Sequence, residues 1–242
     1  MKFYKALKPV KALSFDLDDT LYDNVPVISK AEEHFALMLT RRYGLPQKCE
    51  HNSFWKEIKD LALQREPQLR DDVTALRVQG LLDAFALLKQ PLEGGRDEAY
   101  ALIGEFIKIR SEISVPKSSF ELLGDLRRKY TVAALSNGNS DLNVSGLASF
   151  FDYDFRPEIG GPRSKPCADL FLKYASLLGI EPSQILHVGD EPQTDINGAV
   201  KAGCQCAWLY RGYAGKSTDE RVLFAIPTLV LDNLLELRGL LL

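Results

Sequence analysis

Three short apolar runs in this sequence end abruptly in polar residues, and this feature limits the possible folds more than any other. A continuous apolar run bounded by polar residues is typical of a buried strand. Carboxylates do not continue into an apolar core, so each is expected at the carboxyl end of its strand. The runs, with the residues that end them, are Ala12–Phe15 before Asp16, Thr131–Leu135 before Ser136, and Ile185–Val188 before Gly189 and Asp190.

Helical segments separate these runs in the C-terminal half of the chain. The pattern predicts helices over Ser119–Lys129, Asp169–Leu178 and Thr194–Ala202, with Gly179 ending the second of them. A short strand at 153–155 and further strands at 206–210 and 228–231 complete the alternation. Strands alternating with helices predict an α/β fold with a doubly wound, Rossmann-like parallel sheet. Ligands bind such sheets outside the carboxyl ends of the strands.

Residues 23–115 have a different character, because their apolar residues recur at helical spacing and no strand pattern is present. Breaks fall near Gly44, Pro67 and Pro91, which predicts about four helices. We therefore expect an inserted α-helical bundle at 23–115 and a catalytic core made of residues 1–22 and 116–242.

Composition excludes several classes of function. The chain has 242 residues with a formal net charge of −3, and no basic excess indicates nucleic-acid binding. No apolar run is long enough to span a membrane, and no signal peptide is recognisable at the start. Four cysteines without a C-x-x-C pair indicate neither a disulfide framework nor a zinc site. The expected location is the cytoplasm, and the sequence leaves the oligomeric state open.

The polar residues that end the strands suggest a chemistry. Close carboxylates such as Asp16, Asp18 and Asp190 repel one another, at about 4 kcal/mol per contact near 4 Å and an effective dielectric of 20, unless a cation lies among them. Oxygen ligands without histidine or cysteine favour Mg²⁺ over zinc. Lys165 and the Ser136 and Asn137 donors would then hold an anion beside the metal, and a phosphoryl group is the obvious candidate.

Four motifs occur in order along nearly the whole chain, and together they resemble the haloacid dehalogenase-like hydrolase superfamily. The motifs are Asp16-Leu17-Asp18-Asp19-Thr20, Ser136-Asn137-Gly138, Lys165-Pro166 and Gly189-Asp190 followed by Asp195. The resemblance implies that the helical segment is a type 1 cap that closes over the active site. It also implies that Asp16 is the nucleophile and a Mg²⁺ ligand, and that Asp18 is the general acid and base.

The same resemblance assigns the remaining site residues. It implies that Asp190 completes the metal site, to which Asp18 adds its backbone carbonyl. Ser136 and Lys165 match the pair that holds the phosphate. Asp195 matches the last acid of the fourth motif, and Thr20 is expected in a supporting role.

The stretches around these motifs also look like the bacterial flavin mononucleotide phosphatases. That likeness implies a Mg²⁺-dependent phosphatase acting on flavin mononucleotide (FMN) or on the ribitylaminouracil phosphate of riboflavin biosynthesis. Two alternatives stay open at this point. One is a related activity on the same scaffold, either a phosphatase of another small metabolite, such as a sugar phosphate or a nucleotide, or a phosphosugar mutase. The other is a receiver-type phosphoacceptor domain, against which the chain length argues.

Overall fold

Strand β2 (Ala12–Phe15) lies inside the sheet and is flanked by the two strands whose ends carry the other candidate residues. The computed structural model describes residues 1–210, 212–213 and 223–242. Its sheet has seven strands in the order β1-β7-β6-β5-β2-β3-β4. All neighbouring strands are parallel except β1 and β7. The strands are β1 (Lys2–Phe3), β2 (Ala12–Phe15), β3 (Thr131–Leu135), β4 (Tyr153–Phe155), β5 (Ile185–Gly189), β6 (Gln205–Leu209) and β7 (Leu229–Leu231).

The register of the central strands aligns their carboxyl ends. Phe15 pairs with Ala134 of β3 on one side and with Val188 of β5 on the other. The residues that follow these strands therefore emerge at one edge of the sheet. This arrangement confirms the predicted doubly wound parallel fold.

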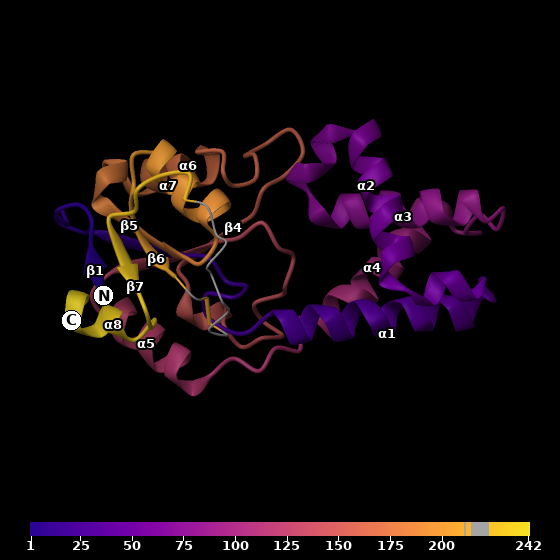
Figure 1. Cartoon of the computed structure of the whole chain (residues 1–242), viewed down its shortest axis with the longest axis horizontal. Coiled ribbons are helices and arrows are strands. Elements are labelled where there is room, and N and C mark those ends of the chain that lie inside the picture. Colours follow the sequence, from indigo (N-terminus) through magenta and orange to yellow (C-terminus); the bar gives the residue numbers. More distant parts are fainter. Residues whose placement is uncertain (211, 214–222) are drawn as a thin grey trace.

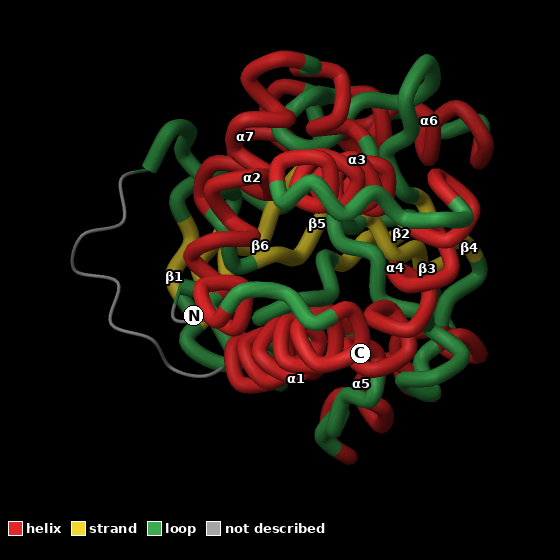
Figure 2. The backbone as a smooth tube through the Cα atoms, turned by 90° about the vertical axis from the view of Figure 1, so that its right-hand side faces the viewer, coloured by secondary structure: helices red, strands yellow, loops and turns green. Residues whose placement is uncertain are grey.

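Helices cover both faces of the sheet, and Figure 2 shows the strands as a band between them. On one face, α5 (Lys117–Arg127) and α8 (Glu236–Leu241) pack on a core that includes Leu13, Phe15 and Val188. On the other face, α6 (Asp169–Leu178) and α7 (Asn197–Lys201) pack on a second core that includes Ala133 and Leu135. Alternate side chains of β2 and β3 enter opposite cores, as the period of two in a strand requires.

The segment between β2 and α5 consists of helices and lies at the opposite end of the molecule from the chain termini (Figure 1). These helices share a core of their own that contains Phe35, Val78, Phe85 and Phe106. We call the four α-helices and the turns between them the helical insert. It contains α1 (Val25–Tyr43), η1 (Gln47–Glu50), α2 (Asn52–Arg65), η2 (Pro67–Asp71), α3 (Val73–Leu87) and α4 (Gly95–Ser111).

Most predicted elements agree with the structure. The predicted helix at 169–178 and its left-handed Gly179 cap are confirmed, as are the breaks in the insert near Gly44, Pro67 and Pro91. The core also contains the short 3₁₀ turns η3 (Ala148–Phe150) and η4 (Pro182–Gln184). Within the described residues, no helix is both long and apolar enough to cross a membrane.

One predicted helix has a different form. The segment expected to be a helix over 194–202 begins with a π-helical turn, η5 (Pro192–Ile196), and continues as α7. The side chain of Asp195 is turned inward, where it accepts a hydrogen bond from the Glu191 N–H at 3.0 Å. π turns occur often where a helix must position a functional side chain. Strand β1 was not predicted, because two exposed residues at a sheet edge carry no periodic pattern.

Candidate active site

Lys165 is buried at the carboxyl edge of the sheet between two carboxylates. Its ammonium donates to Asp16 Oδ1 at 2.7 Å, to Asp195 Oδ1 at 2.6 Å and to the Leu135 carbonyl at 2.6 Å. The Lys165 side chain is 1 % exposed, and that of Asp16 is 12 % exposed. All three ammonium hydrogens therefore have acceptors. The lysine joins the ends of β2 and β3 to the π turn after β5.

This charge arrangement shifts three pKa values. Burial opposes the charge on Lys165, but the carboxylates of Asp16 and Asp195 raise its pKa to about 12. Burial raises the pKa of Asp16 well above its ordinary value, and the carboxylates of Asp195 and Asp190 raise it further against the opposing effect of Lys165. Burial also disfavours ionised Asp195, but Lys165 and His187 lower its pKa below the usual range. The lysine therefore stabilises an ionised Asp195, while Asp16 has a strong affinity for a proton or another cation.

Asp190 joins this group from the end of β5. Carboxylate oxygens of Asp16, Asp190 and Asp195 lie within 4.8 Å of one another, and all three residues are buried. Gly189 permits the approach, because a Cβ atom there would lie 2.4 Å from Asp195 Cγ. Thr20 donates from Oγ1 to Asp190 Oδ1 at 3.3 Å, and Trp208 donates from Nε1 to the Asp190 carbonyl at 2.8 Å. Thr20 thus lies beside Asp190.

The donor set fits Mg²⁺. Buried carboxylate oxygens without cysteine are hard ligands of the kind that Mg²⁺ prefers. The Asp16, Asp190 and Asp195 carboxylates share the single positive charge of Lys165, and a divalent cation would relieve the remaining repulsion among them. The grouping also contains the Asp195 carboxylate, which the predicted ligand set did not include. The Asp18 carboxylate lies outside the grouping, which agrees with the expectation that Asp18 would contribute only its backbone carbonyl.

Asp18 contacts the helical insert instead. Arg110 of α4 donates from Nη2 to both Asp18 oxygens at 3.1 Å, and Tyr22 donates its hydroxyl to Asp18 Oδ1 at 2.8 Å. The Arg110 side chain is only 3 % exposed. Gly138 leaves room for Asp18, because a Cβ atom there would lie 2.7 Å from Asp18 Oδ2 and 3.4 Å from Ser136 Oγ. Ser136 and Asp18 are therefore neighbours across Gly138.

The loop after β3 is ordered by its own side chains. Ser136 Oγ accepts a hydrogen bond from the Gly138 N–H at 3.0 Å. The Asn137 amide pairs with the backbone of Lys165, donating to its carbonyl and accepting from its N–H, both at 2.9 Å. Asn137 thus couples the second motif to the third, a contact that its predicted role in holding the anion did not include.

Two contributors to this site were not identified from the sequence. Arg110 belongs to a helix that otherwise shows only an amphipathic pattern. The other is His187, which is fully buried, with its Nε2 3.4 Å from Asp195 Oδ1 and its Nδ1 2.9 Å from Ser14 Oγ. Burial lowers the pKa of His187, which favours a neutral ring in contact with the Asp195 carboxylate. The position of His187 two residues before Gly189 was the available signal for this role.

The helical insert also contacts the core near the start of α3. Asp71 accepts hydrogen bonds from the Ser164 N–H at 2.7 Å and from Ser164 Oγ at 2.8 Å. Asn139 donates from Nδ2 to Thr74 Oγ1 at 3.2 Å. Ser164 precedes Lys165, and Asn139 belongs to the loop after β3. The insert therefore touches the same loops that form the site.

A parallel sheet with a lysine-bridged carboxylate group at its carboxyl edge defines an α/β enzyme suited to a small anionic substrate. The sequence matches the family model described as haloacid dehalogenase-like hydrolase over residues 10–203, and the chain belongs to this family.

Relatives and solved structures agree with this assignment. The chain is 34 % identical to the 5-amino-6-(5-phospho-D-ribitylamino)uracil phosphatase YigB of Escherichia coli, over 99 % of this chain and 100 % of that protein. It is 28 % identical to a phosphoserine phosphatase of Thermus thermophilus, over 84 % and 90 % of the two chains. The crystal structure of a 2-haloacid dehalogenase from Pseudomonas syringae matches with a TM-score of 0.79 and 29 % identity, over 96 % of this chain and 98 % of that one. The family and the phosphatase relatives support phosphatase activity.

Proposed function

We propose that this protein is a Mg²⁺-dependent phosphatase that hydrolyses a small phosphomonoester through an aspartyl-phosphate intermediate. The observation that carries the proposal is the buried Asp16 carboxylate, held by Lys165 beside Asp190 and Asp195. In this proposal the core consists of residues 1–22 and 116–242, and residues 23–115 form a cap. The proposed place of action is the cytoplasm.

Asp16 supplies the nucleophile. One of its oxygens accepts from Lys165, which orients the carboxylate and leaves the other oxygen to attack phosphorus. A P–O bond forms to Asp16 as the bond from phosphorus to the leaving oxygen breaks. Bound by the Asp16 and Asp190 carboxylates and the Asp18 carbonyl, Mg²⁺ would neutralise phosphate charge that otherwise repels the nucleophile. Ser136 would donate to a phosphate oxygen, the positive charge of Lys165 would attract the phosphate, and Asn137 keeps their loops together.

Asp18 moves the protons of both steps. In the first step it donates a proton to the leaving oxygen, so that an alcohol departs. In the second step its carboxylate accepts a proton from the water that attacks phosphorus, which releases inorganic phosphate and restores Asp16. Its contacts with Tyr22 and Arg110 hold the carboxylate at the side of the site that faces the insert. The insert would exclude water while the first step occurs.

The relatives indicate the class of substrate. YigB acts on 5-amino-6-(5-phospho-D-ribitylamino)uracil according to its name, and its likeness extends over the whole of both chains. We propose this compound or the related FMN as the substrate. The remaining phosphatase relatives act on other small phosphate esters, which makes a different metabolite the second candidate.

Phosphate release with and without metal tests the proposal. The Asp16→Asn variant should lose at least about 10³-fold in kcat on an aryl phosphate, because it removes the nucleophile. Removing Mg²⁺ with a chelator should abolish activity, and adding it back should restore activity. Asp125→Asn, which alters a surface carboxylate paired with Arg128, serves as the matched control and should retain wild-type rates.

The alternatives give different outcomes. Undiminished phosphate release by Asp16→Asn would exclude the proposed mechanism. An aspartyl-phosphate that persists for minutes would indicate a receiver, whereas a requirement for a bisphosphate activator would indicate a mutase.

A further inference from the structure

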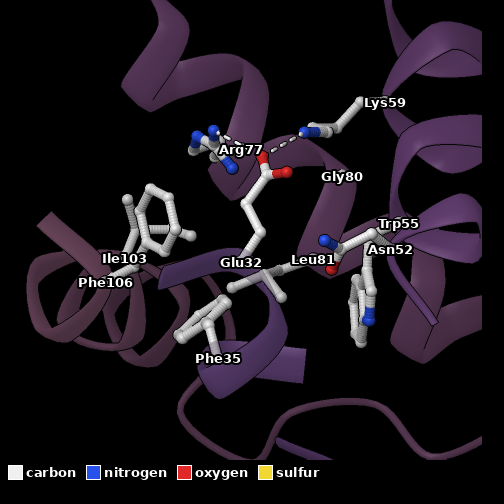
Figure 3. A pocket seen from close by; sticks show the side chains of 10 residues that line it. All are labelled: Glu32, Phe35, Asn52, Trp55, Lys59, Arg77, Gly80, Leu81, Ile103 and Phe106. Carbon is white, nitrogen blue, oxygen red and sulfur yellow. Dashed lines mark hydrogen bonds and ion pairs between the residues drawn. The ribbon is translucent and has the colours of Figure 1, made fainter. Parts of the chain in front are cut away.

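A cavity opens among the four α-helices of the insert (Figure 3). All four α-helices contribute to its wall: Glu32 comes from α1, Trp55 from α2, Arg77 from α3 and Phe106 from α4. Its volume is about 40 Å³. A volume of this size holds about three water molecules, which is comparable to one six-membered ring.

The charges at the cavity favour a ligand that accepts hydrogen bonds. Arg77 donates to Glu32 Oε1 at 3.0 Å, and the Lys59 ammonium lies 3.5 Å from the same oxygen (Figure 3). Two cations thus face one carboxylate, which leaves a net positive charge. Arg77 Nε is buried and has no hydrogen-bond partner within the described residues. A buried donor normally has a hydrogen-bond acceptor. A carbonyl oxygen of a ligand would supply this acceptor for Arg77 Nε.

The apolar part of the wall favours a planar ligand. Phe35, Trp55 and Phe106 present aromatic rings around the charged group (Figure 3). The Arg77 guanidinium lies over the Phe106 ring, 4.1 Å from its centroid. Aromatic rings and a stacked guanidinium bind flat, electron-rich rings well. Aromatic surface together with cationic donors matches a heterocycle that carries carbonyl groups.

Gly80 keeps this space open at a cost to its helix. It lies in the middle of α3, where glycine is about 1 kcal/mol less favourable than alanine. A Cβ atom at Gly80 would lie 3.1 Å from Lys59 Cγ, so a side chain there would enter the space between α2 and α3. Gly104 in the middle of α4 is different, because a Cβ atom there would meet nothing within 4 Å. The two glycines form a matched pair for a test.

The cavity lies close to the residues that join the insert to the core. Phe106 precedes Arg110 by one helical turn on α4, and Arg77 follows Thr74 by one turn on α3. Arg110 contacts Asp18, and Thr74 contacts Asn139. A turn of helix rises roughly 5.4 Å. A leaving group with a chain of several carbons between its phosphate and its ring could therefore place its phosphate at Asp16 and its ring in the cavity.

We propose that this cavity in the helical insert binds the base of the leaving group, a single six-membered ring with carbonyl acceptors such as a pyrimidinedione. This inference rests on the proposed phosphatase function and narrows its substrate. The three fused rings of a flavin are larger than a single ring, and part of them would remain outside the cavity. A ribitylaminouracil phosphate is therefore favoured over FMN.

The test compares three substrates in three proteins. The substrates are 5-amino-6-(5-phospho-D-ribitylamino)uracil, FMN and ribitol 5-phosphate, which has the chain without a ring. The proteins are the wild type, Gly80→Leu and the control Gly104→Leu. In Gly80→Leu, the ratio of kcat/KM for the uracil compound to kcat/KM for ribitol phosphate should fall at least about tenfold, because the ring loses its site. In Gly104→Leu this ratio should stay within about twofold of wild type.

A binding measurement keeps the inference testable if the leucine variant does not fold. The dephosphorylated ribitylaminouracil should inhibit wild-type hydrolysis of ribitol phosphate competitively and at least about tenfold more tightly than ribitol does. An unchanged ratio in a folded Gly80→Leu, equal inhibition by the two products, or a higher kcat/KM for FMN than for the uracil compound would overturn the inference. Failure of the wild type to hydrolyse any of the three esters would instead contradict the proposed function.

Discussion

Arg110 of α4 and Asp18, two residues after β2, form the ion pair that joins the helical insert to the candidate site. One guanidinium nitrogen lies 3.1 Å from both oxygens of the carboxylate. The same nitrogen donates to Asn24 Oδ1 at 3.2 Å, just before α1, so the contact involves both ends of the insert. The proposed general acid is therefore held by a residue of the insert.

Arg110→Ala should lower kcat/KM for a phosphomonoester by about 10- to 100-fold, because Asp18 and the insert lose the contact that positions them. Arg110→Lys should recover part of this loss, since a lysine supplies the charge without the fork geometry of arginine. Steady-state kinetics measure both variants. Arg42→Ala is the control, because Arg42 forms an exposed ion pair with Glu105 on the same insert. Equal kinetics for Arg110→Ala and Arg42→Ala would show that the pair has no part in turnover.

Lys165→Met should destabilise the fold by about 3–5 kcal/mol, the usual cost of removing one partner from a buried ion pair. The variant leaves Asp16 and Asp195 buried without their shared cation. Chemical denaturation measures the loss. The double variant Lys165→Met with Asp195→Asn should recover part of the stability, because it also removes one of the stranded charges. A double variant no more stable than Lys165→Met would contradict this account.

The sequence was sufficient to predict the parallel sheet and to name residues that the structure brings together at its carboxyl edge. Apolar runs ending in Asp16, Ser136 and Asp190 identify neighbouring parallel strands, because only a strand end can expose such residues beside a core. The structure brings Asp16, Asp190, Asp195 and Lys165 together and places Thr20 beside Asp190. The roles proposed for these residues remain predictions.

The rest of the site depends on contacts that leave no local pattern. Arg110 is one of the basic residues in the last turn of α4, and only the docking of the insert brings it to Asp18. The π turn depends on an inward-facing Asp195, and the match of Asp195 to the fourth motif does not give the direction of its side chain. Tertiary contacts decide both features, so helical periodicity could not reveal them.

Gly189→Ala should destabilise the protein by about 1–3 kcal/mol and reduce activity, because its Cβ atom would collide with Asp195 and displace the carboxylate group. Gly104→Ala should have the opposite effect on stability, since it gains up to about 1 kcal/mol of helix propensity and meets no neighbour. Thermal denaturation and phosphate release measure the two effects. Similar stability and activity in the two variants would contradict the close packing of Gly189 against Asp195.

Asp16→Asn should raise the stability of the metal-free protein near neutral pH. The pKa of Asp16 is well above its ordinary value of 3.8, mainly because of burial. The folded state therefore binds a proton more tightly than the unfolded state, and the stability contributed by this group is lost as the pH rises from about 4 through the folded pKa. Asparagine does not titrate, so the advantage of the variant should grow over that interval and vanish at lower pH.

The stability difference between Asp16→Asn and the wild type is measured by thermal denaturation across this pH range in the presence of a chelator. Each 1 kcal/mol of difference should shift Tm by about 2–4 °C. Added Mg²⁺ should stabilise the wild type more than Asp16→Asn, because a metal requires the ionised carboxylate. A variant less stable than wild type at neutral pH without metal would show that the Lys165 pair outweighs the burial and repulsion that raise the pKa of Asp16.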